Sequence, residues 1–435
     1  MFKLKRPVLL ALTLLGLSVW LLFSAGNRNF AVAASSPYED LRLFTDALAL
    51  IRHSYVEEVD TRKLIYGGIR GMMQTLDPHS GFLPPDAYQA MQDDTRGEFG
   101  GVGIEVSMRD DALIVVAPIE DTPAFHAGVL AGDQILSIDQ EEVAGLDIMQ
   151  VISLLRGDAG SPVTLSLKRG DNEEPLTVQL ERELIHVDSV KARLISPGYG
   201  YVRLLQFQER TDVELQQALI ALRKQNNNTL DGLILDLRNN PGGLLDQSIK
   251  VADLFLDKGL VVYTEGRDPD SQLKYMAHQK GTEPDCPMVV LIDGGSASAA
   301  EIVAGALQDH KRAILLGTRS FGKGSVQIVV PMSDGSGLRL TTARYFTPLG
   351  RSIQALGIEP DIFVQKGILQ VVSTVTAQRE QDLKNHFSSQ ASDKKTSASP
   401  SDAPVDKDSR DDYQLMRALD LLKGWNFFGR TAPAA

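Results

Sequence analysis

The chain has 435 residues, which at roughly 150 residues per domain corresponds to about three domains. Hydrophobic residues make up 43% and charged residues 23% of the sequence, a balance that excludes a wholly disordered or collagen-like chain. The net charge of −12 argues against a surface for nucleic acid or anionic membrane, because both need a basic face.

The first 33 residues have the three-part layout of a secretory signal. Basic residues at positions 3, 5 and 6 precede an apolar run from Val8 to Phe23, and Ala31–Ala33 offers a small-residue cleavage site. The run is short for a membrane-spanning helix, although an uncleaved anchor stays open as an alternative. The segment holds four basic and no acidic residues, so the exported part carries −16. We expect a periplasmic or cell-envelope protein.

Residues 34–96 carry two helical patterns. Apolar residues at steps of three and four predict a first helix over Glu39–Ile51. Asp60 is the predicted N-cap of a second helix, which Asp77-Pro78 ends because the residue before a proline is driven out of the helical region. We interpret the pair as a helical hairpin that serves packing or pairing with a second subunit.

Residues 97–184 change to short strands separated by turns, with one helix predicted at Asp147–Leu155. The strand-like stretches are Gly103–Met108, Ala112–Pro118, Gln134–Ile138, an alternating run through Val163, Leu165 and Leu167, and Leu176–Leu180. About 90 residues of this kind are typical of a compact barrel-like module.

From residue 185 to 365, strands and helices alternate, which predicts an α/β layer architecture. The predicted strands are Tyr201–Gln206, Gly232–Leu237, Met288–Ile292 and Ala313–Leu316, and the predicted helices are Val213–Lys224, Gln247–Leu256 and Ala299–Asp309. Residues 366–410 are rich in Ser, Asp, Lys and Pro, as flexible linkers are. Residues 411–435 hold a last helix, Asp411–Leu422, and a tail. We expect this helix and Glu39–Ile51 to lie outside the core, where they could dock between subunits.

Three glycine-marked loops are the candidates for chemistry, because catalytic groups of open α/β sheets gather at the carboxyl ends of strands. The loops are Leu237–Gly243, Gly294–Glu301 and Phe321–Gln327. Cys286 is the only cysteine, and the seven histidines form no pair with metal-ligand spacing. We therefore expect neither a metal nor another cofactor.

The third loop resembles a phosphate-binding loop, since Gly317-x-x-x-x-Gly322-Lys323 matches most of the signature G-x-x-x-x-G-K-[ST]. Position 324, however, is glycine where a hydroxyl for Mg²⁺ is required. Val326–Pro331 is strand-like, whereas the signature needs a helix. We reject nucleotide binding.

The second loop puts Ser298 at the start of a predicted helix, where unpaired N–H groups stabilise a developing oxyanion. The chain has no G-x-S-x-G elbow and no histidine marked as a partner, so Lys323 is the alternative base. A neutral lysine at pH 7 needs a pKa about 3 units below normal, or about 4 kcal/mol, which burial can supply. On spacing alone, Ser298 is more often a helix N-cap and Gly-Lys-Gly a hairpin turn. Ser296 is a competing nucleophile.

Longer motifs resemble those of the carboxyl-terminal processing peptidases, also called tail-specific proteases. GGSASAAEIVAGALQD at 294–309 and FGKGSVQ at 321–327 carry the resemblance, together with DLRNNPGG and TTARYFTPLGRSIQALGIEPDI from the family's catalytic core. LRLFTDALALIRHSYVEEVD and LDPHSGFL resemble its N-terminal region, and GGVGIEV the entry to its PDZ domain. The resemblance implies a crotonase-like α/β serine protease core, an inserted PDZ-like β-barrel domain and an N-terminal helical region.

By this resemblance Ser298 is the nucleophile, Lys323 the general base and Gln327 the residue that orients the lysine. The implied oxyanion donors are the backbone N–H groups of Ala299 and of a loop glycine, either Gly242 or Gly243. Peptide binding falls on Gly101, Val102 and Gly103, whose N–H groups can meet a terminal carboxylate, and on the strand from Ile104, which can pair with an extended peptide.

The implied function is an exported serine endopeptidase that recognises substrate C-termini through its PDZ domain and processes or degrades envelope proteins. The alternative is a non-catalytic PDZ peptide-binding scaffold, or a PDZ module that serves only as a structural lid. An acyl transferase follows from fold analogy alone, and Lys323 argues against it. The expected partners are proteins with accessible C-termini and further copies of the chain. An adaptor protein, which some bacterial relatives use, has no signature here.

Overall fold

The computed structural model describes residues 37–109, 112–170, 174–268, 270, 272–279, 283, 286–367, 383–384 and 412–431. The predicted signal at 1–33 and nearly all of the predicted linker at 366–410 lie outside these residues. The contacts divide the chain into two compact units, one up to Thr75 and one from Leu76 onward. None of the described helices combines the length and apolar character that a membrane span requires.

The described part of the first unit, residues 37–75, contains two helices, α2 (Pro37–Ser54) and α3 (Thr61–Gln74). The Asp60 side chain accepts a hydrogen bond from the backbone N–H of Arg62 at 2.8 Å and so caps α3, as the sequence predicts. The segment that follows adds β1 (Gly81–Leu83) and the unpredicted helix α4 (Pro85–Arg96).

Two short strands join the barrel-like module to the rest of the second unit. β2 (Glu98–Gly101) leads into the module and β9 (Glu183–His186) leads out of it, and the two pair antiparallel. The chain therefore enters and leaves the module at one place, as an inserted domain does.

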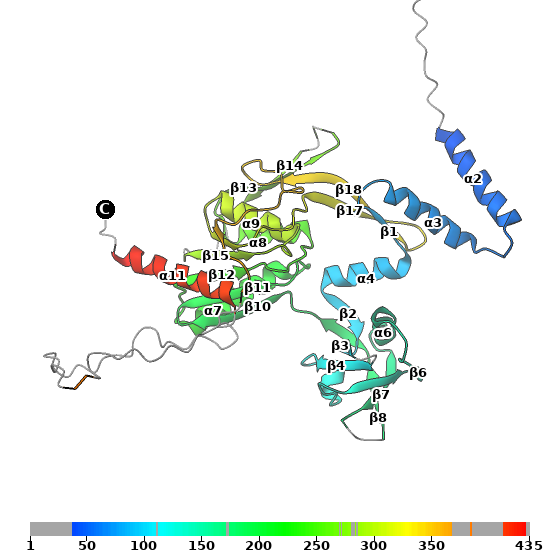
Figure 1. Ribbon diagram of the computed structural model, residues 1–435, viewed down its shortest axis with the longest axis horizontal. Coiled ribbons are helices and arrows are strands. Elements are labelled where there is room, and N and C mark those ends of the chain that lie inside the picture. Colours follow the sequence, from blue (N-terminus) through cyan, green and yellow to red (C-terminus); the bar gives the residue numbers. More distant parts are fainter. Residues whose placement is uncertain are drawn as a thin grey trace, which may run out of the picture. The chain divides into compact units, whose positions relative to one another are not determined.

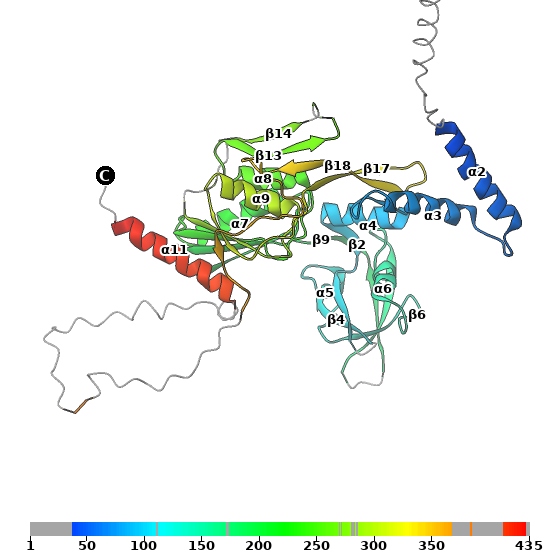
Figure 2. The same cartoon turned by 45° about the horizontal axis from the view of Figure 1, so that its top comes forward.

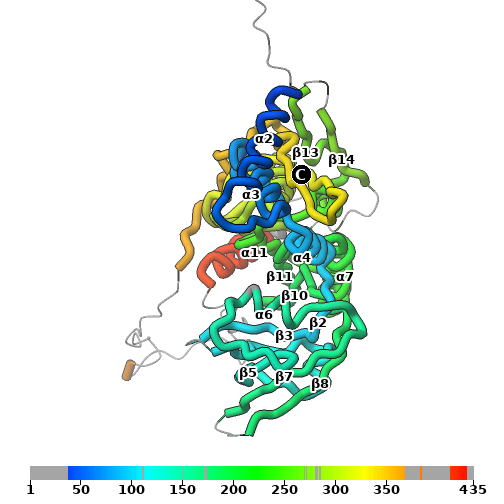
Figure 3. The backbone as a smooth tube through the Cα atoms, turned by 90° about the vertical axis from the view of Figure 1, so that its right-hand side faces the viewer, coloured from blue at the N-terminus to red at the C-terminus, as the bar shows by residue number. Residues whose placement is uncertain are grey.

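The module is a sheet in the order β3-β4-β5-β7-β8, with β6 beside β5, and it forms one compact group in Figure 3. Its elements are β3 (Ile104–Arg109), β4 (Ala112–Pro118), α5 (Pro123–His126), β5 (Gln134–Ile138), β6 (Glu141–Glu142), α6 (Ile148–Leu155), β7 (Pro162–Lys168) and β8 (Leu176–Glu181). Asp147 caps α6 through a capping box with Gln150. β3 lies at the edge of the sheet, so one side of its backbone has no strand partner.

The second unit outside the barrel-like module contains a mostly parallel sheet and an antiparallel sheet. The first has the order β10-β11-β12-β15-β16-β19, with only β10 running antiparallel. Its strands are β10 (Val190–Ser196), β11 (Tyr199–Leu204), β12 (Gly232–Asp236), β15 (Met288–Ile292), β16 (Ile314–Gly317) and β19 (Ile362–Phe363). The second joins β1 to β13 (Gly259–Gly266), β14 (Leu273–Ala277), β17 (Ser325–Pro331) and β18 (Gly337–Phe346).

The main core lies between the two sheets, where α8 (Leu245–Asp253) and α9 (Ala299–Asp309) are sandwiched in both views of Figures 1 and 2. α7 (Thr211–Gln225) adds its buried leucines to the same core. Every residue of α9 from Ala299 to Leu307 is buried, which suits a helix with neighbours on all sides. Small residues permit this packing, since a Cβ on Gly305 would lie 2.9 Å from the Thr347 side chain.

The last helix, α11 (Tyr413–Thr431), corrects the prediction for the C-terminal region. It continues past Leu422, and the apolar residues of its first half lie in the core of their own chain, whereas Trp425, Phe427 and Phe428 of its second half are exposed. Leu415, Leu419 and Leu422 are buried against the parallel sheet of their own chain, on the face opposite α8 and α9. Both faces of the sheet can be covered because successive side chains of a strand point to opposite faces. Ile234 faces α11, while its neighbours in β12 face the main core.

Candidate active site

The three glycine-marked loops follow β12, β15 and β16, three neighbouring parallel strands, so they meet at one edge of the sheet. Backbone hydrogen bonds join them. The Ala297 N–H donates to the Asn240 carbonyl at 2.9 Å, and the Phe321 N–H donates to the Ser296 carbonyl at 3.0 Å. The loop that carries Ser298 is therefore held on both sides.

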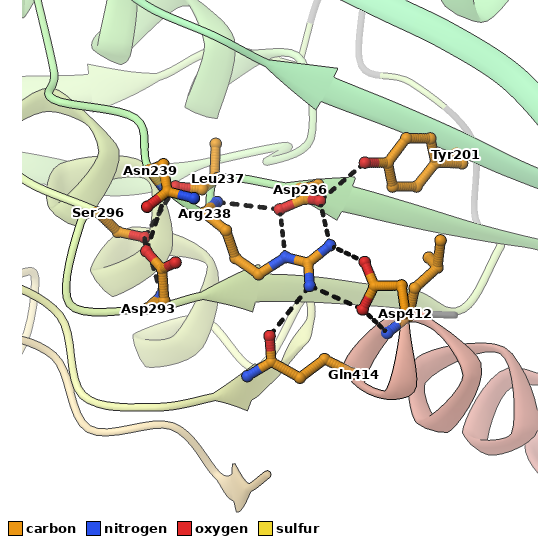
Figure 4. A network of polar contacts seen from close by, with 10 residues as sticks. Tyr201, Asp236, Leu237, Arg238, Asn239, Asp293, Ser296, Asp412 and Gln414 are labelled. Atoms are coloured by element: carbon orange, nitrogen blue, oxygen red, sulfur yellow. Dashed lines mark hydrogen bonds and ion pairs between the residues drawn. The ribbon is translucent and has the colours of Figure 1, made fainter. Parts of the chain in front are cut away.

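Ser298 lies at a strand–turn–helix junction in a strained backbone conformation, with φ 56° and ψ −115°. A non-glycine residue rarely adopts such a φ, and strain of this kind costs about 1–3 kcal/mol. The competing Ser296 is fully buried, and its hydroxyl donates to the Leu237 carbonyl at 2.7 Å and accepts from the Asp293 N–H at 2.9 Å. Figure 4 shows this bonded position. Ser298, in contrast, is partly exposed.

A fully buried carboxylate, that of Glu301, ties the serine loop to the lysine loop. Its Oε2 accepts the backbone N–H of Ser298 at 2.8 Å and that of Lys323 at 2.9 Å. Its Oε1 accepts the Ser320 hydroxyl at 2.6 Å and the Gly322 N–H at 2.7 Å. One side chain thus fixes the backbone of both residues of the predicted dyad.

Lys323 is half-buried, and its environment favours the neutral amine. Burial lowers the pKa of Lys323, the positive charge of Arg339 lowers it further, and the Glu301 carboxylate opposes them. The Tyr345 hydroxyl lies between the two loops, donating to the Lys323 carbonyl and in hydrogen-bond contact with the Ser298 side chain. Burial raises the pKa of Tyr345, so this hydroxyl stays protonated.

The two loop glycines differ in what their N–H groups can do. Gly242 is buried and donates to the Asn240 side chain at 2.9 Å, so its N–H is occupied. Gly243 is exposed, and among the described residues neither its N–H nor that of Ala299 donates a hydrogen bond. Gly242 packs against the serine instead, because a Cβ there would lie 2.8 Å from the Ser298 Cβ. The geometry favours Gly243 as the second oxyanion donor.

Gln327, in β17, has partners other than the lysine. Its amide donates to the Ser325 hydroxyl at 2.8 Å and to the Thr341 hydroxyl at 3.3 Å. The Thr341 hydroxyl in turn donates to the Asp77 carboxylate at 3.2 Å. No hydrogen bond joins Gln327 to Lys323 within the described part of the chain, so the orienting role of Gln327 stays a prediction.

The first loop begins with a buried ion pair. Asp236 ends β12 with no exposed surface and accepts the Tyr201 hydroxyl at 2.8 Å. Arg238 donates to both oxygens of this carboxylate, at 2.9 and 2.6 Å. The other edge of the guanidinium contacts the start of α11 (Figure 4). The network lies directly before the glycines of the loop.

The predicted peptide-binding residues share one cavity of about 400 Å³ in the barrel-like module. Gly101, Val102, Gly103 and Ile104 all line it. The other lining residues come from β2, the edge strand β3, β4 and α6 or its end, and they are Phe99, Glu105, Val106, Val116, Ile152, Leu155 and Arg156. Gly103 has φ +76°, and a Cβ there would lie 2.3 Å from Thr122, so only glycine fits this turn.

One group of described side chains has ligand atoms close enough to hold a metal ion. His186, Asp188 and Glu214 offer such atoms within 4.8 Å of one another. All three lie outside the three loops, and His186 already contacts Glu214 at 3.1 Å. The group has no role in the arrangement around Ser298.

Several residues of the site were not identified from the sequence: Glu301, Tyr345, Asp236 and Arg238. Glu301 follows the serine by three residues, the capping-box spacing, which was the one available signal. The Asp236–Arg238 pair stands at the end of an apolar strand, a place where charged residues are informative.

Comparisons with known proteins show what the chain is similar to. Residues 198–364 match the model of peptidase family S41, residues 100–180 a PDZ domain, and residues 24–87 the activating protease CtpB N-terminal domain. A carboxy-terminal-processing protease of Bartonella bacilliformis is 45% identical over 390 residues, 89% of each chain. A carboxyl-terminal-processing protease of Synechocystis sp. is 38% identical over 74% of this chain and 76% of its own.

A solved structure of a photosystem II D1 C-terminal processing protease is also similar. It is 34% identical, covers 74% of this chain and 92% of its own, and has a TM-score of 0.44.

Changing Glu301 to Gln tests the link between the two loops. An amide nitrogen would face N–H donors, so we expect kcat to fall by about 100-fold and the free energy of unfolding to fall by about 3 kcal/mol. Peptidase kinetics and urea unfolding measure the two effects. Glu141→Gln, at an exposed position in β6, is the control. Wild-type kcat and stability in Glu301→Gln would contradict the assigned role.

Proposed function

Because the chain belongs to peptidase family S41 and is a serine-type peptidase, we propose that it is an endopeptidase in which Ser298 and Lys323 form the catalytic dyad. The observation that carries the proposal is the buried Glu301, which joins the backbones of these two residues. The strained φ of Ser298 and the lowered pKa of Lys323 support it further, since both are common features of activated nucleophile–base pairs.

In the proposed reaction, neutral Lys323 takes the proton of the Ser298 hydroxyl as Oγ attacks the scissile carbonyl. The tetrahedral oxyanion is stabilised by the N–H groups of Ala299 and Gly243 at the N-terminus of α9. Protonated Lys323 then donates its proton to the leaving amine. A water activated by the same lysine releases the acyl group, so one base serves both halves.

The Tyr345 hydroxyl and Gln327 have supporting roles in this proposal. Tyr345 stays protonated and contacts Ser298, so it can orient the nucleophile. Gln327 is held in β17 by its hydrogen bonds to the Ser325 and Thr341 hydroxyls. We retain it as the residue that orients Lys323 when substrate is bound, a state in which catalytic hydrogen bonds tighten.

We further propose that the PDZ domain holds the substrate by its C-terminus. The carbonyls of Val102 and Gly103 accept the N–H groups of Ala124 and Ile119. In a trans peptide the C=O and N–H point in opposite directions, so the N–H groups of Gly103 and Ile104 are directed away from these partners. They are suited to a terminal carboxylate in the cavity, while the free edge of β3 is suited to strand addition.

Export to the periplasm or cell envelope completes the proposal. Its support is the order of basic, apolar and small residues over 1–33, which lie outside the described residues. The bacterial relatives are processing proteases. Envelope proteins with accessible C-termini are the proposed substrates, and assembly into homo-oligomers and the use of an adaptor belong to the same proposal.

Substitution of the dyad tests the function directly. We expect Ser298→Ala and Lys323→Ala each to reduce cleavage of a labelled unfolded protein by about 10⁴-fold or more, and the double variant to be no worse than either. Ser333→Ala and Lys258→Ala, both at exposed positions, are matched controls. Undiminished cleavage by Ser298→Ala would overturn the dyad. A wild-type protein that binds C-terminal peptides without cutting them would support the scaffold alternative.

The pH dependence tests the role of the lysine as base. Free lysine loses its proton near pH 10.5, and burial with the charge of Arg339 lowers the pKa of Lys323. Because only the neutral amine accepts a proton, kcat/KM should rise with pH through a midpoint below 10.5. Arg339→Gln removes one cause of the lowering and should move the midpoint to higher pH, whereas Arg344→Gln, exposed in the same strand, should not. An unmoved midpoint in Arg339→Gln would argue against Lys323 as the titrating group.

Amidation of a substrate tests C-terminus recognition. A peptide with a free C-terminal carboxylate should have a KM about 10- to 100-fold lower than the same peptide with a C-terminal amide, at similar kcat, because charge-assisted hydrogen bonds to the PDZ loop are lost. N-terminal acetylation of the peptide is the control and should leave KM unchanged. Equal KM for acid and amide would exclude carboxylate recognition.

A further inference from the structure

Every N–H donor of the Arg238 guanidinium forms a hydrogen bond, and more than half of these bonds go to side chains at the start of α11. Arginine has five N–H donors. Two go to Asp236, at 2.9 and 2.6 Å. The remaining three go to the Asp412 carboxylate, at 2.9 and 2.6 Å, and to the Gln414 side chain at 3.0 Å. Figure 4 shows the guanidinium between the two carboxylates.

Asp412 also begins α11. The same Oδ1 that accepts from Arg238 accepts the Leu415 N–H at 3.0 Å, in the manner of an N-cap. Gln414 is 2% exposed, and its amide donates to the Val364 carbonyl at 2.7 Å. Burial alone would raise the pKa of Asp412, but its bonds with Arg238 lower it, so the carboxylate is charged when the helix is docked. The ion pair between Asp412 and Arg238 therefore forms when α11 is folded and packed against the sheet.

Docking of the helix does not need this polar contact. Leu415, Leu419 and Leu422 already bury an apolar face on the parallel sheet. A buried ion pair adds little net stability, because desolvation offsets its attraction, and its best-attested value is to specify one geometry. The geometry specified here is that of the Arg238 side chain and the chain that follows it.

The chain that follows Arg238 is the predicted oxyanion loop. The Arg238 N–H donates to Asp236 at 2.9 Å, so the side chain and backbone of Arg238 are fixed by one carboxylate. Asn239 follows with φ 55°, and fully buried Asn240 bonds the Leu204 carbonyl and the Gly242 N–H. Arg238 is thus joined to Gly243 by a short segment in which successive residues are held by hydrogen bonds.

From these contacts we propose that Asp412 and Gln414 are positioning residues that act through Arg238, so that the oxyanion loop at 239–243 reaches its working geometry only when α11 is docked. The inference rests on the proposed function, because it assigns this loop to the oxyanion. It connects the active site with a helix whose first contact residue is 174 positions away in the chain.

Hydrogen exchange of the full chain tests the coupling without any chemistry. In Asp412→Asn, amide exchange over 237–244 should become faster by about 10-fold or more, whereas exchange in β3 to β8 should stay unchanged. Asp420→Asn, on the exposed side of the same helix, is the control and should exchange as wild type. Unchanged exchange over 237–244 in Asp412→Asn would overturn the proposal.

Kinetics test the consequence for the reaction. Asp412→Asn and Gln414→Ala should lower kcat by about 10- to 100-fold with little change in KM, because a misplaced donor is felt in the transition state. Affinity for a peptide boronic acid, which forms a tetrahedral adduct, should fall in parallel with kcat/KM, and Asp412→Glu should recover part of both. Assays run well below the unfolding midpoint of each variant exclude simple unfolding. A folded Asp412→Asn protein with wild-type kcat and boronate affinity would overturn the positioning role.

The two proposals fail in different ways. If Ser298→Ala still cleaves, the assignment of the dyad is wrong, yet the exchange experiment still reports whether Asp412 orders the loop. If Ser298→Ala is inactive and Asp412→Asn matches wild type in exchange and kcat, the dyad stands and the coupling to α11 is wrong.

Discussion

The buried carboxylate of Glu301 is the interaction on which the site depends. Removing a carboxylate from water costs several kcal/mol unless donors replace the water. Here the replacements are three backbone N–H groups and the Ser320 hydroxyl. Those donors come from the turn at Ser298 and the loop at Lys323, so the cost of burial is offset only when both loops are in place. We therefore expect folding of the core and assembly of the proposed dyad to occur together.

The sequence predicted the elements that are apolar and bounded by turns. The bounds of β4, β5, β15 and α9 agree with the prediction: β15 and most of α9 are runs of buried residues, and β4 and β5 are largely apolar stretches that turns delimit. Most of the antiparallel sheet was missed, because β18 mixes charged and Thr residues over a half-buried surface and resembles a loop. The C-terminal helix was found, but its place was wrong, since an apolar helix face does not say which surface covers it.

The residues of the site also fall into two groups, those that sequence motifs indicated and those that only the structure revealed. Local motifs led to the prediction of Ser298 and Lys323, through a resemblance that spans nearly the whole chain. The supporting residues could not be found from local sequence patterns, because their bonds join distant parts of the chain. Glu301 bonds a loop about twenty residues away, and Arg238 bonds a helix 174 positions away. Our preference for Gly243 over Gly242 as the proposed oxyanion donor also rests on the structure, because it depends on which N–H the Asn240 side chain occupies.

The position of Asp412 in the chain has a consequence for the order of events during synthesis. A ribosome completes Ser298 and Lys323 well before it reaches α11, so the emerging polypeptide holds its proposed nucleophile and base before it holds Asp412 and Gln414, the remaining partners of Arg238. On our proposal, cutting ability is the last property that the nascent chain acquires. In this order of synthesis, the proposed coupling to α11 would restrain the protease while it and its neighbours are still unfolded.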